Sequence, residues 1–372
     1  MDFLNIGSML LEVSKPTGMW EYFIFGLESL VKNYGLTIIL ITLAIKLIML
    51  PFDFFNRYIN KKNSLKMAVI KPELDKIQSR YGSNKELLNQ KTMELYKKHN
   101  YNIMGSCLGM IINMAVTMTI FFTLFTGLNK IAAYKIYSEY ITLQTEYETQ
   151  IGGKLEEVKI EGEGEEAQTK LQVVVYNEEG QEVDRFDLTE NLINKANAAV
   201  VKKHDEIKED FLWIKNIWRP DTNASIILSY DDFVSNAKID KSELSENVYN
   251  QIMNPIKAEN SGWNGYFILI IMSAIITYLS SQISIWIGKA KAKKSGKPFV
   301  DAMAQNKILI YLMPIIMALF TLFYNAMFAI YIVTGALFGL VTSPLITLLV
   351  DKMYDKSVKK EEEKVKVSYS RK

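Results

Sequence analysis

Residues suited to catalysis and metal binding are scarce in this sequence. It has one cysteine and two histidines among 372 residues. The lone cysteine, Cys107, cannot form an intramolecular disulfide, so it gives no information on the redox compartment. His99 and His204 lie far apart along the chain, and there is no glycine-rich loop followed by Lys-Ser or Lys-Thr to hold a nucleotide. We therefore expect a protein that is not an enzyme and that has no cofactor and no metal site.

Charge is also absent over long stretches. The 43 residues from Ile308 to Val350 include no Asp, Glu, Lys or Arg, and as a helix they would extend roughly 65 Å. Because a bilayer core is about 30 Å thick, they predict two transmembrane helices with a turn near FYNAM, residues 323–327. Three other apolar runs reach the length of a span, namely residues 35–52, 103–128 and 262–287. The sequence thus predicts five transmembrane helices.

The connections between these spans differ in charge, which predicts the orientation. Residues 53–104, 288–307 and 351–372 have net charges of +6, +5 and +3, whereas residues 129–261 have a net charge of −11. Cytoplasmic loops are enriched in Lys and Arg. Threading five spans puts the three basic segments on one side, so we expect an external N-terminus, a basic cytoplasmic loop at 288–307 and a basic cytoplasmic tail at 351–372.

The N-terminal residues 1–34 lack the pattern of a removable signal peptide. Apolar residues recur there at spacings of three and four: Trp20, Phe23, Leu27, Leu30 and Tyr34. This spacing predicts an amphipathic helix, which either lies in the outer membrane interface or packs on the external domain.

The two long connections are predicted to fold. Residues 53–102 contain a heptad-like apolar seam interrupted at YGSN, residues 81–84, which predicts a cytoplasmic helical hairpin. In residues 129–261, the alternating LQVVVYNEEGQEVDRF predicts a β-hairpin and residues 191–210 predict a helix. The predicted fold class is an all-α polytopic membrane protein with a small α+β external insertion.

A lysine interrupts the first predicted span. Lys46 lies in LTIILITLAIKLIMLPFDFF, where a lone lysine costs about 2.5–3.5 kcal/mol on insertion scales. Snorkelling of the side chain toward the basic loop explains it as well as a functional role does. The other charged residues, Asp301 among them, are interpreted as solvated surface.

Polar side chains recur on one face of three spans. Thr42 precedes Lys46 by one turn, and the second and third spans each repeat polar residues at helical spacings. The residues concerned are Asn102, Ser106, Asn113 and Thr117 in the second span, and Ser273, Thr277, Ser281 and Ser284, with Gln282 adjacent, in the third. Such stripes often serve only close helix packing, as does GALFG at residues 335–339. If they converge, they enclose a hydrated cavity that contains one positive charge.

Four blocks of the chain resemble the YidC/Oxa family of membrane protein insertases. The first begins YGLTIILITLAIKLIMLPFDFF and runs over residues 34–82, and the second is MELYKKHNYNIMGSCLGMIINM at 93–114. The third is FLWIKNI at 211–217, and the fourth is LMPIIMALFTLFYNAMFAIYIVTGALF at 312–338. Their order and the five-span plan match the family, over somewhat more than half of the chain. The long external segment departs from the usual pattern.

The resemblance implies a chaperone-like insertase that acts on nascent membrane proteins without nucleotide hydrolysis of its own. Lys46 occupies the family's usual arginine position in an inner-leaflet groove, and Asn113 falls where the family often has glutamine. Tyr324 and Tyr331 are implied substrate contacts. Membrane lipids, the ribosome and the secretion translocase are further candidate partners. The implied location is the cytoplasmic membrane of a bacterium.

Two other classes of function are compatible with five spans. A small-molecule transporter would be expected to show an internal repeat of spans around a midplane site, yet no repeat is visible and the span number is odd. A membrane-anchored interaction protein would explain the external domain, but it would leave the three polar stripes without a role.

Overall fold

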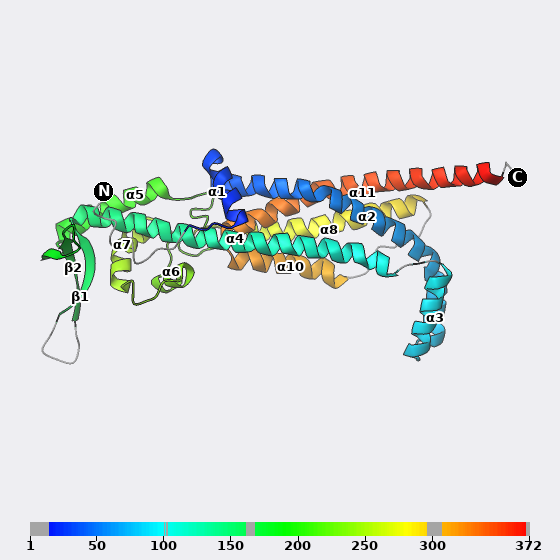
Figure 1. The fold of residues 1–372 in the computed structure, drawn as a ribbon, viewed down its shortest axis with the longest axis horizontal. Coiled ribbons are helices and arrows are strands. Elements are labelled where there is room, and N and C mark those ends of the chain that lie inside the picture. Colours follow the sequence, from blue (N-terminus) through cyan, green and yellow to red (C-terminus); the bar gives the residue numbers. More distant parts are fainter. Residues whose placement is uncertain (1–14, 100, 102, 161–167, 296–306, 370–372) are drawn as a thin grey trace. The chain divides into compact units, whose positions relative to one another are not determined.

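The structure is a computed structural model that describes residues 15–99, 101, 103–160, 168–295 and 307–369. Most of these residues are helical (Figure 1). The elements are α1 (Met19–Val31), α2 (Tyr34–Tyr81), α3 (Lys85–Lys98), α4 (Ile103–Ile151), β1 (Lys154–Ile160), β2 (Gln168–Tyr176), β3 (Glu182–Asp187), α5 (Glu190–Ile207), α6 (Tyr230–Ala237), α7 (Glu246–Glu259), α8 (Ile268–Ser295), α10 (Lys307–Phe323) and α11 (Ala326–Tyr369).

Four of these helices are long and apolar enough to cross a membrane. The qualifying parts are Tyr34–Met67, Met114–Ile151, Ile268–Lys294 and Ala326–Lys356. The apolar helix Ile310–Phe323 is shorter than a usual span. With the small sheet, this confirms the predicted class of helical polytopic membrane protein with an α+β insertion. The break between α10 and α11 falls within FYNAM, where the sequence predicts it.

Two helices extend well past the length of a span. α2 has 48 residues and α4 has 49, so each is about 70 Å long. α2 continues through Pro51 and Pro72 into the predicted cytoplasmic hairpin without a break. It ends at the predicted YGSN turn, where the Asn84 side chain accepts a hydrogen bond of 3.1 Å from the backbone N–H of Leu87 and caps α3.

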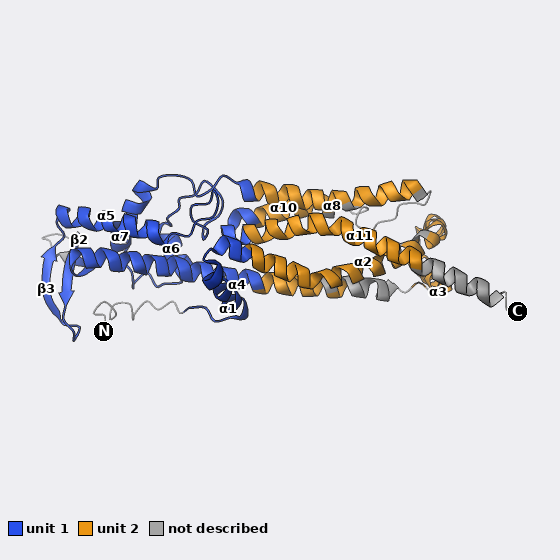
Figure 2. Cartoon of the chain, turned by 90° about the horizontal axis from the view of Figure 1, so that it is seen from above, with its two compact units in different colours: residues 1–38, 124–269, 321–329 blue, residues 39–123, 270–320, 330–372 orange. Residues whose placement is uncertain are grey.

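The chain divides into two compact units (Figure 2). Unit 1 comprises residues 1–38, 124–269 and 321–329, and unit 2 comprises residues 39–123, 270–320 and 330–372. Unit 1 therefore contains the whole of the predicted external segment 129–261, and unit 2 contains Thr42 and Lys46 of the first predicted span. Several long helices contribute to both units.

Aromatic rings from three helices form the core of unit 1. Tyr140 from α4 lies 5.0 Å from Phe233 of α6 and 5.4 Å from Tyr249 of α7, measured between ring centroids. All three side chains are almost completely buried. α4, which includes the predicted second span, thus continues into unit 1 and supplies part of its core through tyrosines in its later residues.

The sheet of unit 1 is small and antiparallel, in the order β1-β2-β3. The predicted hairpin is confirmed as β2 and β3, which are joined at the NEEG turn. Asn177 stabilises this turn, since its Oδ1 accepts hydrogen bonds from the N–H groups of Gln181 and Glu179. Gly180 takes a positive φ of 77°, which glycine adopts without strain.

α1 forms where the apolar spacing predicts a helix. It packs within unit 1 through Glu21 and Ile24, whereas Phe23 and Leu30 are 56% and 80% exposed. Exposed apolar side chains of this kind suit a membrane interface. The interfacial position of α1 stays a prediction.

The interpretation of the remaining charges as solvated surface is wrong for several residues of unit 1. Glu21 is 3% exposed and lies 3.8 Å from Lys130, and His204 is 3% exposed and lies 3.4 Å from the Glu139 carboxylate. Burial lowers the pKa of the His204 imidazole. These groups are buried because the helices that carry them pack on one another, which a sequence pattern does not reveal. Asp301 lies outside the described residues.

A buried carboxylate sets the start of α8. Asp221 is fully buried, and it accepts hydrogen bonds from the backbone N–H groups of Tyr266 at 2.8 Å and Leu269 at 2.7 Å. It also accepts one from the indole N–H of Trp213 at 3.2 Å. Asp221 thus satisfies the N–H group of Leu269 in the first helical turn and that of Tyr266 just before the helix, and α8 begins at Ile268 rather than at Gly262, where the sequence predicts the span to begin.

Replacing Asp221 by alanine is expected to lower the free energy of unfolding by about 3 kcal/mol, because three donors would lose their acceptor in a buried site. The measurement is thermal unfolding of the full chain in detergent, followed by tryptophan fluorescence. Asp231→Ala is the control, since the Asp231 side chain is 77% exposed and pairs only with the exposed Lys241. Equal melting temperatures for the two variants would contradict this role for Asp221.

Candidate functional site

Lys46 lies against a glycine of the last helix. A Cβ atom at Gly335 of α11 would be 3.0 Å from Cε and 3.7 Å from Nζ of Lys46, and 3.8 Å from Cγ2 of Thr42. Lys46 is half-buried, and Thr42 is 1% exposed. Because Gly335 has no side chain, the side chain of Lys46 fits beside α11 at this position. The GALFG stretch does pack closely on a neighbouring helix, and one of the residues that it contacts there is the charged Lys46.

Among the residues that the structure describes, Lys46 forms no salt bridge, although it interacts electrostatically with Asp53. The nearest acidic group on its own helix in sequence is Asp53, two turns further along α2. Because no carboxylate is within salt-bridge distance of Lys46, its ammonium group can still attract a second acidic group.

The structure distributes the predicted site residues over several elements. Thr42 and Lys46 lie on α2, Ser106, Asn113 and Thr117 on α4, Thr277, Ser281 and Gln282 on α8, Tyr324 between α10 and α11, and Tyr331 on α11. Thr117 is exposed, and the three residues of α8 are half-exposed. The side chains of Ser106 and Asn113 lie outside the described residues. Convergence of the three stripes on one groove stays a prediction.

The two tyrosines pack against aromatic residues of α4. The Tyr324 ring lies 4.6 Å from that of Phe125, and the Tyr331 ring lies 6.3 Å from that of Phe121. Tyr331 is only 9% exposed, so a substrate reaches it only if the neighbouring side chains move. Tyr324 is half-exposed and more accessible.

The turn that contains Tyr324 is held by backbone contacts. Asn325 Oδ1 accepts a hydrogen bond of 3.1 Å from the N–H of Phe328 and caps α11. The N–H of Ala326 donates to the carbonyl of Arg219 at 2.9 Å. The segment that follows FLWIKNI therefore fixes the turn between the last two helices of the chain.

An arginine missed by the sequence analysis joins α2 to α11. Arg57 donates from Nη1 to Oγ1 of Thr347 at 2.9 Å and from Nη2 to Oγ of Ser343 at 2.7 Å. The two hydroxyls are one helical turn apart, so the guanidinium spans both with its planar fork. Ser343 and Thr347 are spaced by four residues in the uncharged part of α11, and this spacing could have indicated a polar contact site from the sequence.

One carboxylate joins three helices of unit 2. Asp351 of α11 pairs with Lys61 of α2 at 3.0 Å and also with Lys291 of α8. The side chain of Asp351 is 15% exposed, so the interpretation of the charged residues as solvated surface is wrong for Asp351 as well. Together, Arg57 and Asp351 fix α2 against α11 beyond Lys46.

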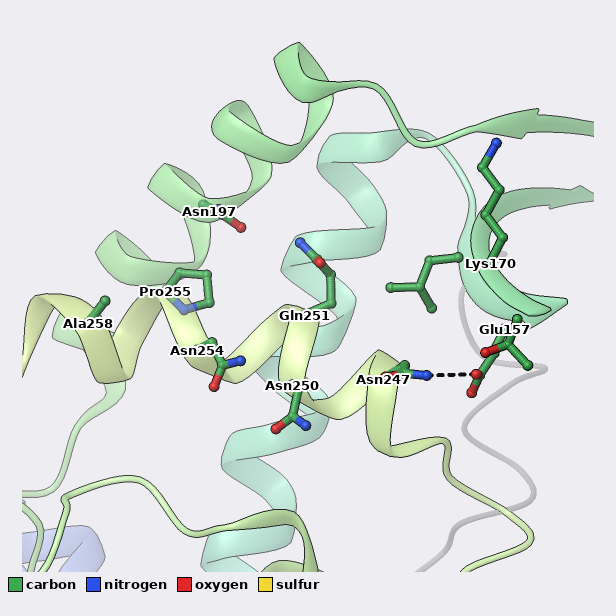
Figure 3. A pocket seen from close by; sticks show the side chains of 11 residues that line it. Glu157, Lys170, Asn197, Asn247, Asn250, Gln251, Asn254, Pro255 and Ala258 are labelled. Atoms are coloured by element: carbon green, nitrogen blue, oxygen red, sulfur yellow. Dashed lines mark hydrogen bonds between the residues drawn. The ribbon is translucent and has the colours of Figure 1, made fainter. Parts of the chain in front are cut away.

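A cavity among the described residues lies elsewhere, in unit 1. It is lined by residues of β1, β2, α5 and α7, and many of these carry side-chain amides (Figure 3). No residue pattern in the sequence analysis pointed to it, because its walls come from four separate elements.

Comparisons with known proteins agree on one family. Residues 26–175 match the model of the family described as 60Kd inner membrane protein. The chain is 36% identical over 101 residues to the membrane protein insertase YidC of Fusobacterium nucleatum, which covers 27% of this chain and 47% of the relative. It is also 36% identical over 108 residues to that of Clostridium perfringens, covering 29% of this chain and 42% of the relative. The chain spans less than half the length of these curated relatives.

Replacing Arg57 by alanine is expected to lower the free energy of unfolding by about 1–3 kcal/mol, because two hydrogen bonds from a charged donor are lost. The double variant Ser343→Ala/Thr347→Ala should cause a similar loss. Adding Arg57→Ala to that double variant should then cost little more, since the same contact has already been removed. Unfolding of the full chain in mixed micelles measures all three.

Thr342→Ala provides the control, because its hydroxyl donates to the Phe338 carbonyl of its own helix. It should leave the free energy of unfolding nearly unchanged. Additive losses for Arg57→Ala and the double variant would show that the contact with α11 does not stabilise the protein.

Proposed function

We propose that the chain, which is similar to the YidC/Oxa family of membrane protein insertases, inserts nascent membrane proteins into the cytoplasmic membrane of a bacterium and assists their folding. The observation that supports this proposal best is the position of Lys46. It is a half-buried cation in a helix of the matched region, and it lies against a glycine of the last helix.

The work of an insertase is to move a polar segment across about 30 Å of hydrocarbon. A hydrated groove in the inner leaflet shortens the dry part of that path. In this proposal Lys46 and Thr42 line the groove on α2, with Thr117 and the polar residues of α8 contributing other walls. No nucleotide hydrolysis is required, because the apolar segment of the substrate gains free energy as it enters lipid.

The charge of Lys46 has a magnitude suited to transient binding. Two unit charges 4 Å apart attract by about 4 kcal/mol at an effective dielectric constant of 20. This is comparable to the cost of about 2.5–3.5 kcal/mol for a charged side chain at the centre of a membrane helix. An acidic residue of the substrate is therefore held long enough for its apolar segment to partition, yet it is released afterwards.

A lysine at this position supplies a positive charge but no fixed hydrogen-bonding geometry. Its ammonium is a point charge on a flexible stem, whereas arginine would grip a carboxylate with two parallel hydrogen bonds. We therefore propose a groove that attracts acidic segments broadly rather than one that orients a single carboxylate.

The topology proposed for this function places the N-terminus and the acidic residues 129–261 outside. The basic hairpin, the loop at 288–307 and the tail at 351–372 then face the cytoplasm, where Lys and Arg are enriched. In this arrangement they are available to anionic lipid, to the ribosome and to the secretion translocase, which we propose as partners beside the nascent chain.

Lys46→Glu is expected to impair insertion of single-span substrates with acidic external tails by about tenfold or more, because attraction becomes repulsion. Lys46→Ala should impair it less, and Lys46→Arg should preserve it. The measurement is protease protection of a radiolabelled substrate in cells depleted of their own insertase and complemented by each variant.

Lys62→Glu is the matched control, since it makes the same change of charge in α2 at an exposed lysine beyond the apolar stretch. Insertion should change little. Normal insertion by the Lys46→Glu variant would refute the role proposed for the groove charge.

A further inference from the structure

Unit 1 contains a cavity of about 590 Å³, which is within the usual range for ligand sites. One wall is formed by β1 and β2, and the others are formed by α5 and α7 (Figure 3). The lining residues are Glu157, Thr169, Lys170, Leu171, Asn197, Asn247, Asn250, Gln251, Asn254, Pro255 and Ala258.

Side-chain amides dominate this lining. Four asparagines and one glutamine line the cavity, together with one carboxylate, one amine and one hydroxyl. No aromatic ring belongs to the lining residues, and only Leu171, Pro255 and Ala258 are apolar. Sites for small molecules have the opposite composition, since apolar and aromatic side chains predominate and polar groups are few.

Two of the amides are fixed by neighbours. Asn247 donates from Nδ2 to Oε1 of Glu157 at 2.7 Å, and Gln251 donates from Nε2 to the hydroxyl of Tyr147 at 2.9 Å. Their carbonyl oxygens then have defined positions. Figure 3 shows Gln251 on α7 and Asn197 on α5 pointing toward one another across the cavity.

Other amides have unused hydrogen-bonding capacity. The side chains of Asn197 and Asn254 make no hydrogen bond to any residue that the structure describes. Oδ1 of Asn197 is buried without a donor. A buried oxygen without a donor is destabilising, so a ligand that supplies an N–H group to this side chain would remove an existing cost.

We propose that this cavity, here called the amide pocket, binds an extended polypeptide segment through its main chain. Each side-chain amide offers a donor and an acceptor, which match the C=O and N–H groups of a peptide. Binding of this kind depends on the backbone and tolerates different side chains. The single Glu157 and Lys170 balance each other's charge, so the pocket favours neither acidic nor basic segments.

The proposal rests on the function proposed above. If residues 129–261 lie outside, the amide pocket faces the side on which translocated polar segments emerge before they fold. A site that retains them there by main-chain contacts would oppose backward movement into the groove. Its partner is therefore the unfolded external segment of the inserted protein.

The test is direct binding by the full chain in lipid nanodiscs. The probe is a fluorescein-labelled ten-residue peptide of Gly, Ser and Asn, which is uncharged and unfolded, and fluorescence anisotropy measures its affinity. The triple variant Asn197→Ala/Asn250→Ala/Asn254→Ala should weaken binding at least tenfold. Asn194→Ala is the matched control, because Asn194 is an exposed asparagine on α5 outside the pocket lining.

Binding should also change little between 50 and 500 mM salt, since neutral groups make the contacts. Absence of peptide binding, or equal binding by the triple variant, would overturn the proposal. So would displacement of the peptide by a neutral oligosaccharide that binds the wild type more tightly, because the pocket would then be a glycan site.

Lys46→Glu separates this inference from the proposed function. It should impair insertion by about tenfold or more, as proposed above, and leave peptide affinity unchanged. Normal insertion by Lys46→Glu together with pocket-dependent peptide binding would refute the groove charge alone. Loss of insertion with no peptide binding by the wild type would refute the amide pocket alone.

Discussion

Hydrocarbon offers no hydrogen-bond partner, so each polar group placed among the apolar helices of unit 2 needs a partner or a route to water. Arg57 meets this requirement with Ser343 and Thr347, and Asp351 meets it with two lysines. These contacts come from residues on α2, α8 and α11. Lys46 differs, since it has space beside Gly335 and forms no salt bridge among the described residues, although Asp53 interacts with it electrostatically.

The same requirement accounts for the irregular part of unit 1. Residues 208–229 contain little regular structure, yet buried hydrogen bonds satisfy backbone groups in and next to this segment. The Asn264 side chain binds the backbone N–H and C=O of Asn216, and the Asp221 carboxylate accepts from the N–H of Leu269. This network determines where α8 begins. The adjoining residues 217–219 bind the turn between α10 and α11, so the ends of three helices depend on one buried polar cluster.

The sequence predicted features that depend on neighbouring residues. The turns at YGSN and NEEG, the helix after the β-hairpin and four of the five predicted spans follow from local patterns and are present in the structure, while the fifth apolar segment forms a shorter helix. Contacts between distant residues were not predictable in this way. The Asp221 contact with Leu269 bridges 48 residues, and the Arg57 contact with Ser343 bridges 286. The amide pocket depends on four elements whose packing no periodicity encodes.

The close approach at Gly335 has a consequence for which side chains positions 46 and 335 can hold together. A side chain at that position and a long cation at position 46 would compete for one volume, because a Cβ atom there already lies 3.0 Å from the lysine stem. The side chains at the two positions therefore limit each other's size. A bulky residue at position 335 would require the cation to shift along α2 or become shorter, or the two helices to move apart.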